Sequence, residues 1–139
     1  MKITELRLQQ DICTAFGNKH PKYRRLLYHI LNNARNAIHG AHMAGAGLVP
    51  GNPDLCLPIP RHPYGALYIE LKLPAERSVV QHLRERLDEG TLPARMNTHY
   101  MHIVSQLQQH DRLTDVGNKV IVCYTLEEAM TAMEDYLMI

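Results

Sequence analysis

Long apolar runs and a strong excess of one charge are both missing from this sequence. No apolar run approaches the roughly 20 residues needed to span a bilayer, so we expect no membrane-spanning helix. The first residues, MKITELRLQQ, lack the apolar centre of a signal peptide, and we therefore expect a cytoplasmic location. The formal net charge is only +1, which argues against a protein that coats nucleic acid through charge alone. The basic cluster at residues 19–25 can still bind phosphates, although a solvated loop has the same composition.

Cysteine pairs with the spacing of a metal or redox site are missing as well. The three cysteines, Cys13, Cys56 and Cys123, are scattered, which predicts reduced thiols in the core. No G-x-G-x-x-G segment follows a predicted strand and no P-loop is present, which argues against a dinucleotide- or nucleotide-binding fold of those types. Repeats and linkers are also absent, so the 139 residues are expected to form one domain.

What is present is a pair of short apolar runs within residues 50–72, PGNPDLCLPIPRHPYGALYIELK. From residue 64 to residue 73 the sequence alternates with a period of two, which is typical of a β-strand. Its odd positions should face the core, while Glu70 and Lys72 share the even face. In the first run Asp54 lies on the face opposite to the leucines. Pairing of the two runs would therefore bring Asp54, Glu70 and Lys72 together on one side of a small sheet.

These three side chains suit metal-assisted hydrolysis of a phosphodiester. Two carboxylates bind a hard cation such as Mg²⁺ and leave positions for water and a phosphate oxygen. The cation lowers the pKa of a bound water, and a neighbouring lysine can orient or deprotonate that water. A Glu-x-Lys pair on a strand is more often a weak, solvated surface pair, so the interpretation depends on the residues around it.

The surrounding residues are Gly47, then Pro50-Gly51-x-Pro53-Asp54-Leu55, then Tyr64-Gly65-x-Leu67-Tyr68-Ile69-Glu70-Leu71-Lys72. Together they resemble the VRR-NUC branch of the PD-(D/E)XK nuclease superfamily. The resemblance is densest over residues 45–73, resumes over 105–137, is loose over 1–44 and is missing over 74–100. Residues 74–100 are therefore predicted to be a helical insertion into a single nuclease domain of residues 1–139.

The resemblance implies a role for each candidate residue. Asp54 and Glu70 would hold Mg²⁺ or Mn²⁺ with help from the backbone carbonyl of Leu71, and Lys72 would position or activate the attacking water. In the family an acidic residue on the first helix completes the metal site. Glu5 is the candidate here, although an acid in the first turn of a helix is also favoured by the helix dipole alone.

A Ser-x-x-Gln signal is also implied, and two glutamines compete for it. Gln81 fits the spacing, but it lies in the predicted insertion and its helix leads into a loop. Gln106 leads directly into the next predicted strand, as in the family. Its helical face continues with His110, Leu113 and Gly117. We therefore prefer Gln106 to Gln81 as the site residue, with a pair of surface glutamines as the remaining alternative.

The rest of the pattern predicts an α/β fold, a small mixed sheet flanked by helices, and the resemblance implies a restriction-endonuclease-like core. The predicted helices are residues 4–16, ending near Gly17; 34–46, after a polar turn at 32–36; 78–89; the helix with Gln106; and a last one opened by the capping box Thr125–Glu128. The predicted strands are 26–31, the two runs described above, and a buried one at 120–124.

The function implied by the resemblance is that of a metal-dependent DNA endonuclease. Stand-alone members of the family are similar to Holliday-junction resolvases and are typically homodimers. That implies a structure-selective, phage or bacterial enzyme that acts on branched DNA in the cytoplasm of a bacterial cell. Two alternatives stay open: a nuclease-fold protein that binds DNA or a partner without cutting, and a nuclease on linear or single-stranded DNA. The intact Asp54, Glu70 and Lys72 argue against the first.

Overall fold

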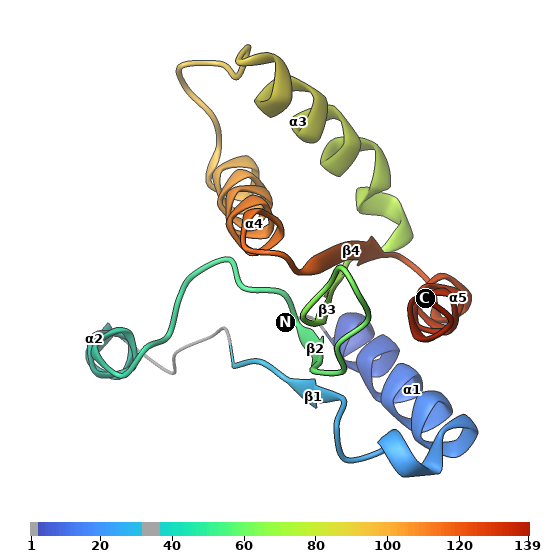
Figure 1. The fold of residues 1–139 in the computed structure, drawn as a ribbon. Coiled ribbons are helices and arrows are strands. Elements are labelled where there is room, and N and C mark those ends of the chain that lie inside the picture. The colour runs from blue at the N-terminus through green and yellow to red at the C-terminus, as the bar shows by residue number, and fades with distance from the viewer. Residues whose placement is uncertain (1–2, 32–36) are drawn as a thin grey trace.

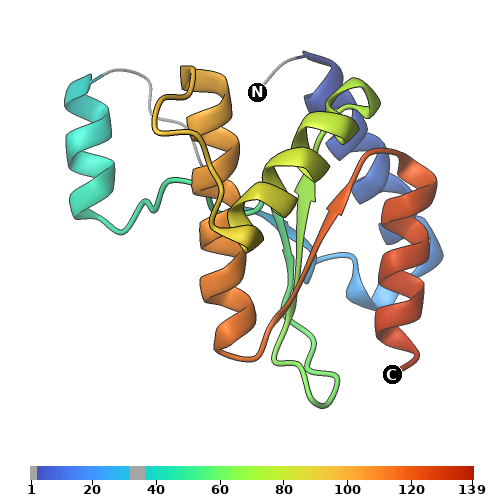
Figure 2. The same ribbon diagram turned by 90° about the horizontal axis from the view of Figure 1, so that it is seen from above.

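The computed structural model describes residues 3–31 and 37–139, which form a mixed four-stranded sheet with helices on both faces (Figures 1 and 2). The helices and strands are, in chain order, α1 (Ile3–Lys19), β1 (Tyr28–His29), α2 (Ala37–Gly45), β2 (Leu55–Leu57), β3 (Leu67–Leu71), α3 (Arg77–Glu89), α4 (Thr98–Asp115), β4 (Lys119–Cys123) and α5 (Leu126–Leu137). Two short 3-10 turns, η1 (Pro21–Tyr23) and η2 (Pro74–Glu76), follow α1 and β3. The predicted α/β class and mixed sheet are confirmed. None of the helices in the described ranges is long and apolar enough to cross a membrane.

The order of strands in the sheet is β1-β2-β3-β4. β2 is antiparallel to both β1 and β3, and β4 runs parallel to β3. In the pairing of β2 with β3, Leu55 lies opposite Ile69, and the same register places Asp54 opposite Glu70. The two apolar runs therefore pair as the sequence predicted.

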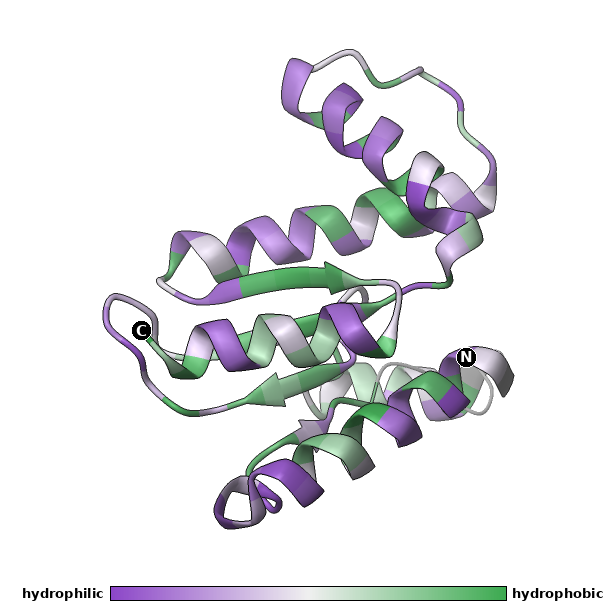
Figure 3. Ribbon diagram, turned by 90° about the vertical axis from the view of Figure 1, so that its right-hand side faces the viewer, coloured by the Kyte–Doolittle hydropathy of each residue, from purple (hydrophilic) through white to green (hydrophobic). Residues whose placement is uncertain are grey.

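One face of β3 packs against α1 and α5. Leu67, Ile69 and Leu71 are buried on this face, as the alternation of the sequence predicted. Their cluster includes residues from both helices: Ile12 and Phe16 of α1, and Ala129, Met133 and Tyr136 of α5. Figure 3 shows the largely hydrophobic strands enclosed by helices that carry hydrophilic residues along part of their surface.

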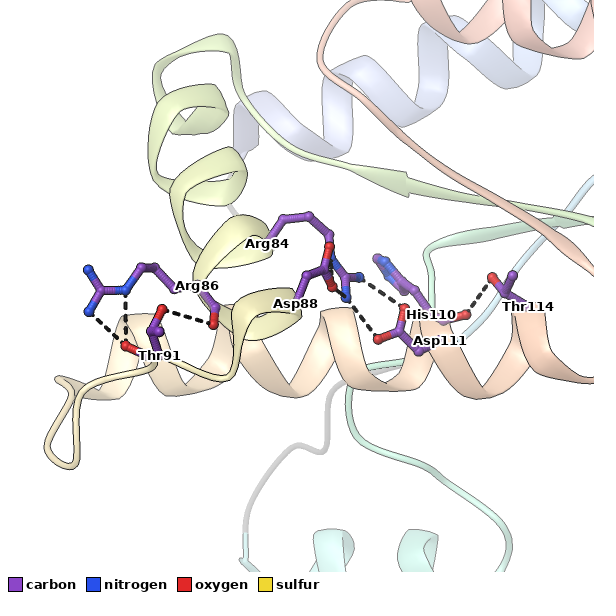
Figure 4. Close-up of polar contacts among 7 residues, drawn as sticks. All are labelled: Arg84, Arg86, Asp88, Thr91, His110, Asp111 and Thr114. Atoms are coloured by element: carbon purple, nitrogen blue, oxygen red, sulfur yellow. Dashed lines mark hydrogen bonds and ion pairs between the residues drawn. The ribbon is translucent and has the colours of Figure 1, made fainter.

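The other face of the sheet is covered by α4, against which α3 packs in a further layer. The two helices share a separate apolar cluster of Val80, Leu83, Ile103, Val104 and Leu107. Arg84 of α3 also donates to both carboxylate oxygens of Asp111 of α4, at 3.0 and 2.9 Å (Figure 4). With this cover in place, Glu70 is 2% exposed and Lys72 is 7% exposed. The two residues are therefore not a solvated surface pair.

The first helix is longer than the sequence predicted. The prediction ended it near Gly17, whereas α1 continues to Lys19. Arg24 explains the difference, because its Nη2 donates to the Gly17 carbonyl oxygen at 2.9 Å and to Asn18 Oδ1 at 3.1 Å. A Cβ atom on Gly17 would lie 2.8 Å from Arg24 Nε. The glycine makes room for a side chain that satisfies the end of the helix, and it does not stop the helix.

Three strand predictions also need correction. The first strand is only β1, because the flanking Leu26 and Leu31 are 40% and 48% exposed at the edge of the sheet. The second apolar run forms β3 over five residues, not over the whole alternating segment. The last strand, β4, was predicted to be buried, but it is the other edge strand and only Cys123 in it is buried. A continuous apolar run does not distinguish an edge strand that helices cover from a central one.

The helix predicted over 34–46 is observed as α2, which lies apart from the sheet in Figures 1 and 2. Residues 34–36 of that prediction and the polar turn predicted at 32–36 lie outside the described residues. The other helix predictions are confirmed. Cys56 and Cys123 are buried free thiols, as predicted, and Cys13 is a half-buried one.

The capping box of α5 gives a direct test of the fold. Thr125 Oγ1 accepts a hydrogen bond from the Glu128 backbone N–H at 3.1 Å, and Glu128 Oε2 accepts one from the Thr125 N–H at 3.2 Å. Thr125→Ala should lower the free energy of unfolding by about 1 kcal/mol, the usual effect of losing an N-cap. Urea unfolding measures this change. Thr131→Ala, at an exposed position inside the same helix, is the control and should not destabilise, because alanine favours helix. Equal losses at both positions would contradict the capping role.

Candidate active site

The residues proposed from the sequence meet at one cavity of about 660 Å³. It lies between the start of α1, the loop before β2, the end of β3 and the middle of α4. The cavity is lined by all six of the preferred candidates: Glu5, Asp54, Glu70, Leu71, Lys72 and Gln106. Gln81 is instead exposed on α3 and lines a different, shallower pocket beside Tyr124. The structure therefore places Gln106, and not Gln81, with the acidic residues.

Asp54 and Glu70 form the centre of this cavity. They lie opposite each other in the register of β2 and β3, and they are 8% and 2% exposed. Asp54 Oδ2 accepts a hydrogen bond from the Leu71 backbone N–H at 2.7 Å. The Asp54 carbonyl oxygen accepts another from the Ile30 N–H at 2.8 Å, which ties the residue to the chain beside β1. Both the side chain and the backbone of Asp54 are therefore held by the sheet.

Burial makes these carboxylic acids hard to ionise. Desolvation, followed by hydrogen bonding to and repulsion from Glu70, raises the pKa of Asp54 to about 8. Desolvation is also the main cause that raises the pKa of Glu70. The pKa of Glu5 is raised by its partial burial and by the nearby Glu76. A group of acids with raised pKa values favours either a bound proton or a bound cation.

Lys72 lies beside the acids and is held by a residue that the sequence analysis missed. The Lys72 Nζ atom is 4.0 Å from Glu76 Oε2, and Glu76 belongs to the 3-10 turn η2 that follows β3. Glu76 Oε1 also accepts a hydrogen bond from the Leu73 N–H at 3.3 Å. The ammonium group thus lies in a defined position between the strand and the turn.

Helix α4 contacts the acidic pair through His110. His110 Nε2 lies 3.2 Å from Glu70 Oε1, and both side chains are buried. Burial lowers the pKa of His110 to about 4, so the imidazole is neutral at neutral pH and can donate a hydrogen bond to the carboxylate. The neighbouring Asp111 is the residue that Arg84 of α3 binds (Figure 4). The layer of α3 and α4 therefore helps to fix the orientation of Glu70.

The loop before β2 is packed tightly on the same helix. Gly51 has a φ of +85°, and a Cβ atom there would lie 2.8 Å from the Ser105 carbonyl oxygen and 3.2 Å from the Gln106 Cα atom. Next to it, Gln109 Nε2 donates to Asn52 Oδ1 at 2.8 Å. Close approach at Gly51 sets the distance between the loop that carries Asp54 and the helix that carries Gln106.

Two buried amide oxygens in this cavity have no hydrogen-bond partner. They are Gln9 Oε1 and Gln106 Oε1, and they are the buried side-chain polar atoms of residues 3–31 and 37–139 without a partner. Both glutamines are 8% exposed and both line the cavity. Unpaired buried acceptors are rare in folded proteins and call for a donor or a cation.

The donor set fits a divalent cation of the Mg²⁺ type. In the part of the chain that the structure describes, no three or more His, Cys, Asp and Glu side chains are grouped as a ready metal site. The cavity offers two adjacent carboxylates, Asp54 and Glu70, and amide oxygens close by. Mg²⁺ is usually bound through one or two carboxylates, while water and phosphate oxygens complete its shell. A cation would also allow both buried acids to ionise.

The fold has a known counterpart. No protein-family model matches the chain, and no curated protein sequence matches it. A solved structure described as a "VRR_NUC domain protein" does match, with a TM-score of 0.67 and 18% sequence identity. The match covers 99% of this chain and 91% of that chain. The chain has the VRR-NUC fold. This finding confirms the fold that the sequence resemblance implied.

Within the VRR-NUC fold, the sequence analysis did not propose Gln9, Glu76 or His110 as site residues. Gln9 and Glu76 line the cavity, and His110 contacts Glu70 beside it. Each of them follows a predicted site residue by four positions, after Glu5, Lys72 and Gln106 respectively. Two of these pairs lie on helices, where residues four apart share a face. The helical spacing was thus the available signal for Gln9 and His110.

The raised pKa of Asp54 predicts how its removal changes stability. In the unfolded chain the group ionises near its ordinary value of 3.8, and in the folded protein near 8. Between these values the folded state binds more protons, so this group lowers the stability as the pH rises from 4 to 8. Asp54→Asn should therefore raise the free energy of unfolding at pH 8 in EDTA by about 1.4 kcal/mol or more, the equivalent of one pKa unit.

Urea unfolding from pH 4.5 to pH 8 in EDTA measures this effect. The advantage of Asp54→Asn over the wild type should shrink towards the acid end of the range. Asp115→Asn, at an exposed position, is the matched control and should show no comparable dependence on pH. An Asp54→Asn variant that is less stable than the wild type throughout would show that the carboxylate is a structural group.

Proposed function

We propose that this protein is a Mg²⁺- or Mn²⁺-dependent deoxyribonuclease of the PD-(D/E)XK type, which hydrolyses phosphodiester bonds. The observation that carries the proposal is the buried pair of Asp54 and Glu70, adjacent in the sheet, with Lys72 beside it in an accessible cavity. A structural pair of buried acids without a cation would cost stability and offer no packing gain. The likeness of fold to a VRR_NUC domain protein supports a nuclease over other metal-dependent hydrolases.

Each residue then has a part in the reaction. Asp54 and Glu70 would hold the cation, with the Leu71 carbonyl and, from α1, Glu5 as further oxygen donors. When bound, Mg²⁺ would lower the pKa of a coordinated water and neutralise charge on the phosphate. Lys72, placed by Glu76, would orient or deprotonate the attacking water. Gln106 would orient Lys72 or that water through its unpaired amide oxygen.

The charge of the cavity supports dependence on a cation. It is lined by four carboxylic acids, Glu5, Asp54, Glu70 and Glu76, and by one lysine, Lys72. The basic cluster at residues 19–25 begins at the other end of α1 from Glu5, about 20 Å away at 1.5 Å per residue. A phosphate would therefore find little positive charge at the acids unless a cation is bound between them.

Substitutions at Asp54 and Lys72 test the catalytic proposal. With Mg²⁺ or Mn²⁺ the wild type should nick supercoiled DNA, and Asp54→Ala should not. Lys72→Ala should bind Mn²⁺ in calorimetry as the wild type does, but should lose about 100-fold or more in rate, the usual contribution of a general base. Lys22→Ala, at an exposed position in the distant basic cluster, is the control for a lost positive charge.

Two outcomes would count against these roles. Equal nicking by the wild type and Asp54→Ala would mean that the activity is a contaminant, and the protein would then be a nuclease-fold binding protein. Lost affinity of Lys72→Ala for Mn²⁺ would contradict the assignment of the lysine to the water and not to the cation.

The DNA substrate is proposed to be branched, and the active protein a homodimer in a phage-infected or bacterial cell. Two sites related by a two-fold axis can cut two strands, as cleavage of a four-way junction requires. The resemblance of the sequence to stand-alone, resolvase-like VRR-NUC proteins supports this choice. Residues 74–100, which form η2, α3, the loop to α4 and the first turn of α4, stay the proposed insertion in a single domain.

A panel of synthetic substrates separates the branched from the linear hypothesis. A four-way junction, a linear duplex of matched sequence and the corresponding single strand are each incubated with the protein and Mn²⁺. Faster cleavage of the junction, together with a dimeric mass in solution, is the expected result. Equal or faster cleavage of the linear or single-stranded DNA would favour a nuclease of those substrates instead.

A further inference from the structure

Gln9 is a buried residue of the cavity to which the mechanism above gives no part. It lies on α1 one helical turn after Glu5, it is 8% exposed, and it lines the same cavity as Asp54 and Glu70. Ile12 and Phe16 follow on the same side of the helix and are fully buried in the core. This anchoring gives the Gln9 side chain a fixed direction, from the core helix into the acidic cavity.

The amide oxygen of Gln9 has no partner in the protein. It shares this property with Gln106 Oε1 alone among the buried side-chain atoms of residues 3–31 and 37–139. An unpaired buried acceptor costs free energy that a methionine or leucine of similar size would not. Both unpaired oxygens belong to one cavity, on helices that cover opposite faces of the sheet. The coincidence points to a ligand that needs oxygen atoms from both sides.

The chemistry of the cavity limits what that ligand can be. A carbonyl oxygen accepts hydrogen bonds or binds cations, so it cannot bind a phosphate oxygen directly. The lysine of the cavity, Lys72, is drawn towards Glu76. Hard divalent cations and their bound waters are the partners that amide oxygens and carboxylates share.

We propose that Gln9 is a further cation-binding residue, whose amide oxygen holds the cation of the Asp54–Glu70 pair directly or through one of its waters. This inference rests on the proposed function, because it presumes that the pair binds a cation. It adds a neutral oxygen donor on α1 to the carboxylates from β2 and β3. It also gives the first helix a role that does not depend on the ionisation of Glu5.

The test compares two neighbouring glutamines. Gln9→Met keeps the length and the burial of the side chain but removes the oxygen, and Gln10→Met makes the same change at an exposed position of the same helix. Calorimetric titration with Mn²⁺ should show about tenfold weaker binding for Gln9→Met, a usual effect of losing one supporting group at a metal site. Gln10→Met should bind as the wild type does.

Stability in EDTA separates this role from a structural one. If the oxygen is unpaired until a cation binds, Gln9→Met should melt at the same temperature as the wild type or higher. A clear loss of stability or a failure to fold would mean that Gln9 supports the fold, and would overturn the proposal. Gln9→Glu keeps an oxygen at the same place and should bind Mn²⁺ at least as tightly as the wild type.

The remaining outcomes are also decisive. Unchanged Mn²⁺ affinity in Gln9→Met, equal losses in Gln9→Met and Gln10→Met, or a tenfold loss in Gln9→Glu would each overturn the role of Gln9. Wild-type protein that binds no Mn²⁺ would instead contradict the proposed function itself. The failure of one proposal is thus distinguishable from the failure of the other.

Discussion

The pairing of β2 with β3 in one particular register is the interaction on which the site depends. Because Leu55 lies opposite Ile69, Asp54 lies opposite Glu70, and the Leu71 N–H can reach the Asp54 carboxylate. A shift of one residue would turn every side chain of the strand to the other face and separate the acids. The apolar odd face of β3, buried against α1 and α5, fixes this register. The core therefore determines the geometry of the polar site on the other face.

The helical layers on both sides have a second effect, which is electrostatic. Burial raises the pKa values of Asp54 and Glu70, so the ionised pair is unfavourable unless a positive charge lies beside it. An exposed pair of acids would not need such a charge. Without a bound cation, Glu70 is still held in place by His110 and the layer of α3 and α4. The protein thus keeps a site that is unfavourable for its own stability, and this is the usual mark of a functional site.

Much of this arrangement follows from the sequence, because its strongest signals are local. The alternation around Glu70, the segment before Asp54 and the capping box at Thr125 each depend on neighbours within a few residues, and each is found as predicted. The extent of α1 was missed because it depends on Arg24, which folds back onto the end of the helix. The half-burial of β4 depends on its place at the edge, which no single strand reveals. The residue type of Gln9 does not indicate a site residue. It stands out only in the structure, where its buried amide oxygen has no hydrogen-bond partner.

Gly51 and Asp54 belong to one sequence motif, but different contacts determine which residue each position needs. The proline-glycine segment is usually considered together with the aspartate that follows it, as if all served the chemistry. Here Asp54 is governed by its hydrogen bond to β3, whereas Gly51 is governed by the backbone of α4 at Ser105. Because glycine has no side chain, it lets two parts of the chain that are 54 positions apart, at Gly51 and Ser105, come into backbone contact. Its counterpart is the backbone of α4 at Ser105 and Gln106, so the glycine also places the helix that carries Gln106.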